Sequence, residues 1–191
     1  MDRDRKISDL VDIVIHLIQE NQDLKKQIAI RNKEARIDFL TGLGNKRHQQ
    51  EEVARLHSLA LGGHLKGSIV CVCSIDVDNM KGINDSQGHD AGDARLIEVA
   101  ETIRKNIRST DVAARTGGDE FTIVALFDEE TEFKSFKRRV TEELMKIETS
   151  IGFSSHRINM DFNFNELFKT SDQHMYAGRR KGDNNMKAGG Q

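Results

Sequence analysis

The first 28 residues carry apolar side chains at alternating intervals of three and four, the heptad spacing of a coiled coil. The seam consists of Ile7, Leu10, Val14, Leu17, Asn21, Leu24 and Ile28. β-Branched residues predominate at the a positions and leucines fill the d positions, a combination that favours two parallel strands. The polar a residue, Asn21, can pair with its counterpart only when two helices are in register. The pattern predicts a parallel dimeric coiled coil within residues 1–35.

Further apolar residues leave a second interpretation of this segment open. Val11, Ile15 and Ile18 widen the apolar face beyond a strict coiled-coil seam. A single amphipathic helix packed on its own domain would show the same widening. The dimer is favoured because Glu20 at g and Lys25 at the following e would also meet across it.

From residue 36 onward the apolar pattern predicts helices alternating with strands. Helices are expected over 45–61, 90–108, 129–147 and 165–180, and strands over 68–75, 112–114, 121–127 and 149–153. The run 68–75 is almost continuously apolar, as in a central strand with both faces buried. The order predicts an α+β domain over residues 36–187, a sheet flanked by helices, with a tail at 188–191.

Charge and cysteine usage narrow the class of protein. The chain has 29 Lys and Arg against 31 Asp and Glu, a net charge of −2 that offers no positive field for a nucleic acid. No apolar run is long enough to span a bilayer. Cys71 and Cys73 alternate along a predicted strand, where they are poorly placed to bond each other or to hold zinc. We therefore expect a cytoplasmic protein with no nucleic acid and no membrane among its partners.

Carboxylates gather at two predicted strand ends. Asp76 and Asp78 close the buried strand, and Asp119 and Glu120 follow the glycines of a predicted hairpin. Acidic loop residues are usually only solvated, but four of them at two strand ends suit a hard cation such as Mg²⁺.

Two other ion or phosphate sites are excluded by the residues present. A calcium loop that opened at Asp76 would need Gly at its sixth position and Glu at its twelfth, where the chain has Lys81 and Gln87. Residues 62–68 are glycine-rich but lack the lysine of a phosphate loop.

Several sequence blocks together resemble the GGDEF family of diguanylate cyclases. Residues 76–93 read Asp-Val-Asp-Asn-Met-Lys-Gly-Ile-Asn-Asp-Ser-Gln-Gly-His-Asp-Ala-Gly-Asp, and residues 115–121 read Arg-Thr-Gly-Gly-Asp-Glu-Phe. Residues 38–45, residues 150–152 and Asp172 with Tyr176 extend the resemblance over 36–187. It implies a ferredoxin-like fold of the kind found in class III nucleotide cyclases and polymerase palms. It also implies that two GTP are condensed into cyclic di-GMP, with release of pyrophosphate, at the interface of a homodimer.

The resemblance assigns metal and catalytic roles. Two Mg²⁺ ions, with Mn²⁺ possible, would be held by Asp76, the main chain of Val77, Asp119 and Glu120. The catalytic residues would be Asp119, Glu120 and Lys81.

The resemblance also assigns substrate contacts. The substrate-binding residues would be Asn79, Met80, Lys81, Asn84, Asp93, Gly117, Gly118 and Arg179. Asn84 and Asp93 would recognise guanine, because a carboxylate accepts from its N1 and N2 donors and adenine has no such pair. Asp93 therefore argues for GTP and against a related cyclase that makes a mixed purine product.

Two positions depart from the family pattern. Met80 stands where the family usually has an aromatic residue, and Asp183 where it commonly has a second phosphate-binding arginine. Arg179 keeps the first charge, and Arg180 or Lys181 could supply the second.

A regulatory site is also implied. Arg108 and Asp111 match the family's product-inhibition motif, Arg-x-x-Asp, five residues before the glycines, and would bind cyclic di-GMP. The alternative is an ordinary helix end, with Arg108 complementing the helix dipole.

A second function stays open beside the enzyme. A GGDEF domain without activity can serve as a cyclic di-GMP receptor. The hairpin acids Asp119 and Glu120 are usually lost in such members and are present here. The enzyme is therefore the favoured hypothesis.

Overall fold

The computed structural model describes residues 14–24, 35–159 and 162–188, with side chains as far as Gly178. Contacts between Cα atoms divide the chain into two units, residues 1–37 and 38–191. In the first unit residues 14–24 are helical, and Val14, Leu17 and Leu24 are about half exposed. Other seam residues, among them Ile7, lie outside the described residues. The parallel dimer stays a prediction.

The second unit contains the predicted helices and strands in the predicted order. They are β1 (Gly44–Asn45), α2 (Lys46–Leu61), β2 (Ile69–Val77), α3 (Met80–Gln87), α4 (His89–Asn106), β3 (Val112–Arg115), β4 (Glu120–Phe127), α5 (Glu130–Met145), β5 (Thr149–Arg157) and α6 (Phe164–Ala188). Four features were not predicted: the two-residue strand β1, the full helix α3, the four extra residues of β5, and the extension of α6 from residue 180 to Ala188. None of the described helices is long and apolar enough to cross a membrane.

The five strands form one sheet in the order β1-β3-β4-β2-β5. β2 lies antiparallel to both β4 and β5, β3 lies antiparallel to β4, and β1 adds a parallel edge beside β3. The succession β2-α4-β3-β4-α5-β5 is the βαββαβ order of a ferredoxin-like fold. The predicted α+β class is confirmed.

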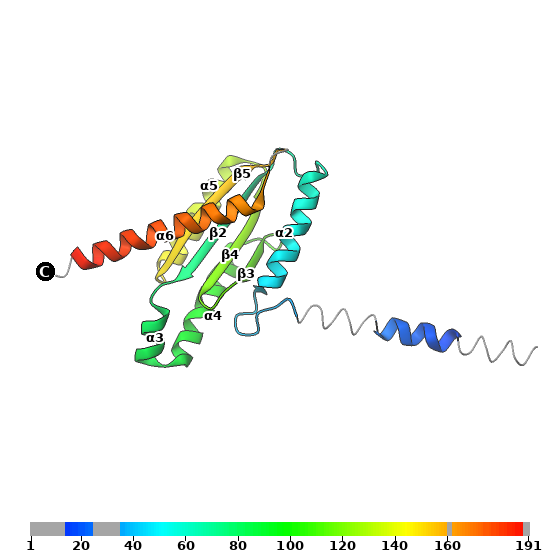
Figure 1. The fold of residues 1–191 in the computed structure, drawn as a ribbon, viewed down its shortest axis with the longest axis horizontal. Coiled ribbons are helices and arrows are strands. Elements are labelled where there is room, and N and C mark those ends of the chain that lie inside the picture. The colour runs from blue at the N-terminus through cyan, green and yellow to red at the C-terminus, as the bar shows by residue number, and fades with distance from the viewer. Residues whose placement is uncertain (1–13, 25–34, 160–161, 189–191) are drawn as a thin grey trace, which may run out of the picture. The chain divides into compact units, whose positions relative to one another are not determined.

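Helices cover both faces of the sheet (Figure 1). All nine residues of β2 are buried, and alternate residues point to opposite faces. Residues such as Cys73 and Ile75 pack with α4 and α5, whereas Val70 and Val72 pack with α2 and α6. The cysteines are free thiols, and burial raises the pKa of Cys71 to about 12, which keeps it protonated.

α6 lies directly on β5 and depends on a glycine for this close approach. A Cβ at Gly152 would collide with the Ser171 carbonyl and the Met175 amide of α6. Buried polar groups also hold α6 to the sheet: the hydroxyls of Ser74 on β2 and Ser171 on α6 lie 2.8 Å apart. Ser154 Oγ also donates to the Leu167 carbonyl at 2.7 Å. Contacts with the sheet therefore determine the position of α6, the helix that carries Asp172 and Tyr176.

We expect Gly152→Ala to lower the free energy of unfolding by about 1–3 kcal/mol, because the added methyl group overpacks the contact between α6 and β5. The midpoint measured by differential scanning calorimetry should fall by roughly 3–10 °C. Gly178→Ala is the matched control, since a Cβ there meets only the Ile151 carbonyl oxygen at 3.9 Å. It should leave stability unchanged or raise it by up to about 1 kcal/mol. Equal losses in the two variants would contradict this account of Gly152.

Candidate functional site

The two acidic motifs meet at one end of the sheet. β2 ends where β4 begins, so Asp76 is paired across the strands with Glu120. The Val77 amide donates to the Asp119 carbonyl at 3.1 Å. Asp76 is only 4% exposed, whereas Glu120 is exposed. The structure thus brings all four predicted metal-binding residues together, and their role as ligands stays a prediction.

The donor chemistry of this group fits Mg²⁺ or Mn²⁺. Among the residues described, no three His, Cys, Asp or Glu side chains are placed to hold a metal ion together. Mg²⁺ does not require such a cage, because one or two carboxylates with waters and substrate phosphates often hold it. Carboxylate and main-chain oxygens at the end of β2 suit an ion that binds together with a nucleotide.

The chain turns sharply after β2 into α3. Asp78 Oδ1 accepts from Ser150 Oγ at 2.7 Å, which fixes the carboxylate to β5. Asn79 adopts the left-handed conformation, with φ at 57°, and its side chain lies against Gly82, where a Cβ would collide. Lys81 is exposed at the start of α3. The N-terminus of α3, where anions are favoured, thus follows directly on the end of β2.

Met80 packs partly against the core of the domain. Its side chain is half-buried and packs against the core between the sheet and α4 and α5. Methionine is flexible enough to fill such an irregular gap. Met80 therefore has a packing role, and its contact with substrate stays a prediction.

The two predicted guanine-reading residues lie near each other across α3 and α4. Asn84 Oδ1 lies against Gly92, and a Cβ on Gly92 would collide with it. Asp93 is the next residue of α4 and is exposed. The absence of a side chain at Gly92 thus makes room for the Asn84 carboxamide.

The hairpin glycines have different surroundings. A Cβ on Gly117 would lie 2.6 Å from Glu120 Oε2, so Gly117 makes room for this carboxylate. A Cβ on Gly118 would meet no atom within 4 Å. Gly118 leaves open space above the hairpin, which suits the approach of a ligand.

Arg115 joins the hairpin to the entrance of the domain, a role that the sequence analysis missed. Its Nε and Nη2 donate to the Gly118 carbonyl at 3.0 and 2.6 Å. Its Nη1 lies 3.4 Å from Asp38 Oδ1. The same oxygen accepts from the Thr41 amide and hydroxyl at 2.9 and 2.7 Å. Burial alone would raise the pKa of Asp38. The hydrogen bonds from Thr41, together with the positive charge and hydrogen bond of Arg115, hold this pKa below its usual value.

Arg108 and Asp111 lie at the far end of α4. Asp111 Oδ2 accepts from the Arg108 amide at 2.7 Å, which closes a turn. Burial raises the pKa of Asp111 and outweighs this hydrogen bond. Arg108 also lines a cavity of about 290 Å³ together with Phe127, Glu132 and Arg139. Arg139 comes from α5 and could not have been found from the four-residue motif.

Residues of α6 approach the hairpin acids. Asp172 and Tyr176 line a cavity of about 200 Å³ together with Lys46 and Glu120. The side chain of Arg179, one helical turn further on, lies outside the described side chains, as does that of Asp183. Their contacts with phosphate stay predictions.

Comparisons with known proteins agree on one family. The model of the diguanylate cyclase GGDEF domain matches residues 35–185. The probable diguanylate cyclase DgcJ of Escherichia coli is 34% identical over 148 residues, which cover 75% of this chain and 29% of DgcJ. The cyclic di-GMP phosphodiesterase NbdA of Pseudomonas aeruginosa is 39% identical over 111 residues, 58% of this chain and 14% of NbdA. The chain spans about 30% of the length of the first curated relatives it matches.

A solved structure shows the same fold. The coiled coil and GGDEF domain of DgcB from Caulobacter crescentus, in complex with c-di-GMP, superposes with a TM-score of 0.77. The match covers 91% of this chain and 95% of that one at 23% sequence identity. At this identity the likeness concerns the fold.

We expect Asp38→Asn to lower the free energy of unfolding at pH 7 by about 1–3 kcal/mol, because it weakens the charged bonds to Thr41 and Arg115. A carboxyl with a lowered pKa stabilises the folded state above its ordinary pKa of 3.8 and loses this effect as the pH falls through the lower folded value. The difference between wild type and variant in urea unfolding should therefore shrink below pH 3.8. Asp128→Asn, at an exposed position, should cost less than about 0.5 kcal/mol at either pH. A constant difference at all pH values would contradict the role assigned to Asp38.

Proposed function

The chain belongs to the diguanylate cyclase GGDEF domain family, and we propose that it condenses two molecules of GTP into cyclic di-GMP, releasing two pyrophosphates. The observation that carries this proposal is the pairing of Asp76 with Glu120 across β2 and β4. It joins the acids of two motifs that are distant in the sequence. The named cyclases among the relatives support the same class of reaction.

The hairpin acids would serve the chemical step. Two Mg²⁺ ions held by Asp76, the Val77 main chain, Asp119 and Glu120 would neutralise the triphosphate and activate the attacking 3′-hydroxyl. Glu120 is exposed beside Gly117, where its carboxylate can accept the proton of that hydroxyl. Lys81 and the first amides of α3 would offer positive charge to the phosphate oxygens.

Base selection would follow from α3 and α4. Asn84 offers a donor and an acceptor to the guanine edge, and Asp93 accepts from N1 and N2. Arg179 would add a phosphate contact from α6, and Arg180 or Lys181 would replace the charge that Asp183 lacks.

Two copies of the chain are required by the product. Each domain would bind one GTP, and each 3′-hydroxyl would attack the nucleotide held by the other, because one site alone cannot close the ring. The coiled coil within residues 1–35 would supply the homodimer and raise the effective concentration of one site at the other.

The second candidate is a receptor for cyclic di-GMP without catalytic activity. The cavity at Arg108, with Arg139 beside it, favours binding of an anionic dinucleotide whether or not the hairpin acids react. The products formed from GTP distinguish the two functions, because a receptor would release none.

The protein incubated with GTP and Mg²⁺ should form cyclic di-GMP, identified by its mass. Asp76→Asn and Glu120→Gln should abolish turnover while far-ultraviolet circular dichroism and the melting midpoint stay near those of wild type. Asp90→Asn, at an exposed position on the first turn of α4, is the control and should keep its rate. A rate above about a tenth of wild type in Asp76→Asn would overturn the metal assignment, since tenfold represents only about 1.4 kcal/mol.

Arg108→Ala should keep a near-normal initial velocity but lose inhibition by added cyclic di-GMP. The reason is that a guanidinium can donate two bonds to a guanine edge or a phosphate, while Asp111 accepts from the guanine donors. Arg139→Ala should weaken inhibition as well. Inhibition as strong as in wild type would leave Arg108 and Asp111 as the end of a helix.

A further inference from the structure

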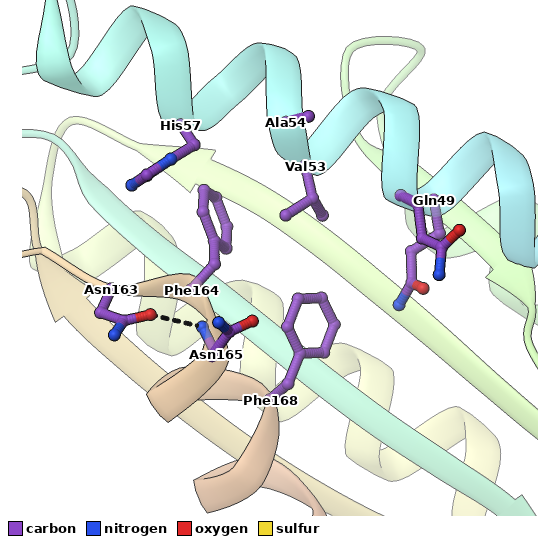
Figure 2. A pocket seen from close by; sticks show the side chains of 9 residues that line it. Gln49, Val53, Ala54, His57, Asn163, Phe164, Asn165 and Phe168 are labelled. Atoms are coloured by element: carbon purple, nitrogen blue, oxygen red, sulfur yellow. Dashed lines mark hydrogen bonds between the residues drawn. The ribbon is translucent and has the colours of Figure 1, made fainter.

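The two faces of the sheet are covered differently. α4 and α5 pack against each other on one face. On the other face, α2 packs against β3 and α6 packs against β5 and β2, and a cavity of about 310 Å³ lies between these helices. We name this cavity the α2–α6 groove. It is lined by Gln49, Gln50, Val53, Ala54 and His57 of α2 and by Asn163, Phe164, Asn165 and Phe168 around the start of α6 (Figure 2).

The α2–α6 groove has apolar walls and amide groups at its margins. Val53 and Phe168 supply partly exposed apolar surface, Phe164 is only 5% exposed, and Gln49 and Asn165 bring carboxamides from opposite sides (Figure 2). None of the lining residues is Asp, Glu, Lys or Arg. The groove therefore offers no countercharge, and it suits an uncharged ligand.

Aromatic rings meet at this groove. The Phe162 and Phe164 rings are 4.6 Å apart in an edge-to-face arrangement. The rings of His57 and Phe168 each lie 6.4 Å from that of Phe164. Another flat ring can join such a cluster in the same offset or edge-to-face geometries.

We propose that the α2–α6 groove binds an uncharged heteroaromatic ring of nucleobase size. Its face would pack on Phe168, which is partly exposed, and its polar edge would pair with the carboxamides of Gln49 and Asn165, which each offer a donor and an acceptor. A volume near 300 Å³ is at the lower end of the range for small-molecule pockets. Asn84 and Asp93, the residues predicted to bind the guanine of the substrate, do not line this groove.

The groove adjoins the catalytic end of the sheet. Gln49 and Phe168 line both the α2–α6 groove and the 200 Å³ cavity that Glu120 and Thr116 also line. A ring seated in the groove would therefore contact two side chains that border the cavity next to Glu120. We assign it the role of an effector, a step that rests on the proposed function of Glu120.

Adenine is a suitable probe, because it is uncharged at neutral pH and has no phosphate. In titrations of the ¹⁵N-labelled full chain up to about 5 mM, adenine should shift the side-chain amide signals of Gln49, Asn163 and Asn165, with a dissociation constant of about 1 mM for a ligand of this size. The backbone amides of Thr116 and Glu120 should shift with the same dissociation constant. These signals do not depend on turnover, so an inactive protein would leave the test of the groove intact.

Two tryptophan variants on α2 make the test specific. Ala54→Trp fills the groove from its wall and should weaken adenine binding at least tenfold. Arg55→Trp, at an exposed position of α2 that does not line the groove, should bind like wild type. Absence of shifts, shifts centred on Asn84 instead of Gln49, or unchanged binding in Ala54→Trp would overturn the site. Binding without shifts at Thr116 and Glu120 would overturn the effector role.

Discussion

Burial of β2 on both faces is the constraint on which the rest of the domain depends. All nine residues of this strand are buried, so it must have a neighbouring strand on each side and helices above and below. The pairing of β2 with β4 and β5 then determines which residues lie beside the last residues of β2. Asp76 is a buried carboxylate next to Glu120 on one side and Ser150 on the other, because the register of β2 leaves no alternative. The strand that forms the core thus also positions the acids.

The parts around this strand end are held by polar contacts that cross between elements. Arg115 ties the Gly118 carbonyl to Asp38, and Asp38 is the first residue of the second unit. These contacts link the entrance of the domain to the hairpin tip. A second support comes from α6. Gly152 lets this helix approach β5 closely, and Asp172 and Tyr176 of α6 line the same cavity as Glu120. The hairpin is therefore supported from two directions, by Arg115 at the end of its own strand β3 and by residues of α6.

The sequence predicted what local periodicity encodes and missed what pairing and packing decide. Strand β2 and helix α5 followed from apolar spacing alone. The last residues of β5, Ser154 to Arg157, include polar and charged side chains, and they are a strand because β2 offers partners along its whole length. The meeting of Asp76 with Glu120 followed from a family resemblance. Arg139 belongs to a different element from Arg108 and is joined to it only by the packing of α5, which no local pattern reveals.

The length of β4 separates catalysis from its proposed inhibition. Glu120 begins this strand and Phe127 ends it, and the Arg108 guanidinium lies 5.7 Å from the Phe127 ring. Seven steps of about 3.3 Å put the two ends roughly 23 Å apart. A dinucleotide held at Arg108 is therefore too distant to contact Glu120 of the same domain. Inhibition from that position would therefore act on how the two domains of a dimer are arranged, by favouring an arrangement in which their sites do not face each other. Its strength would equal the difference between the dinucleotide's binding free energies for this arrangement and for the productive one.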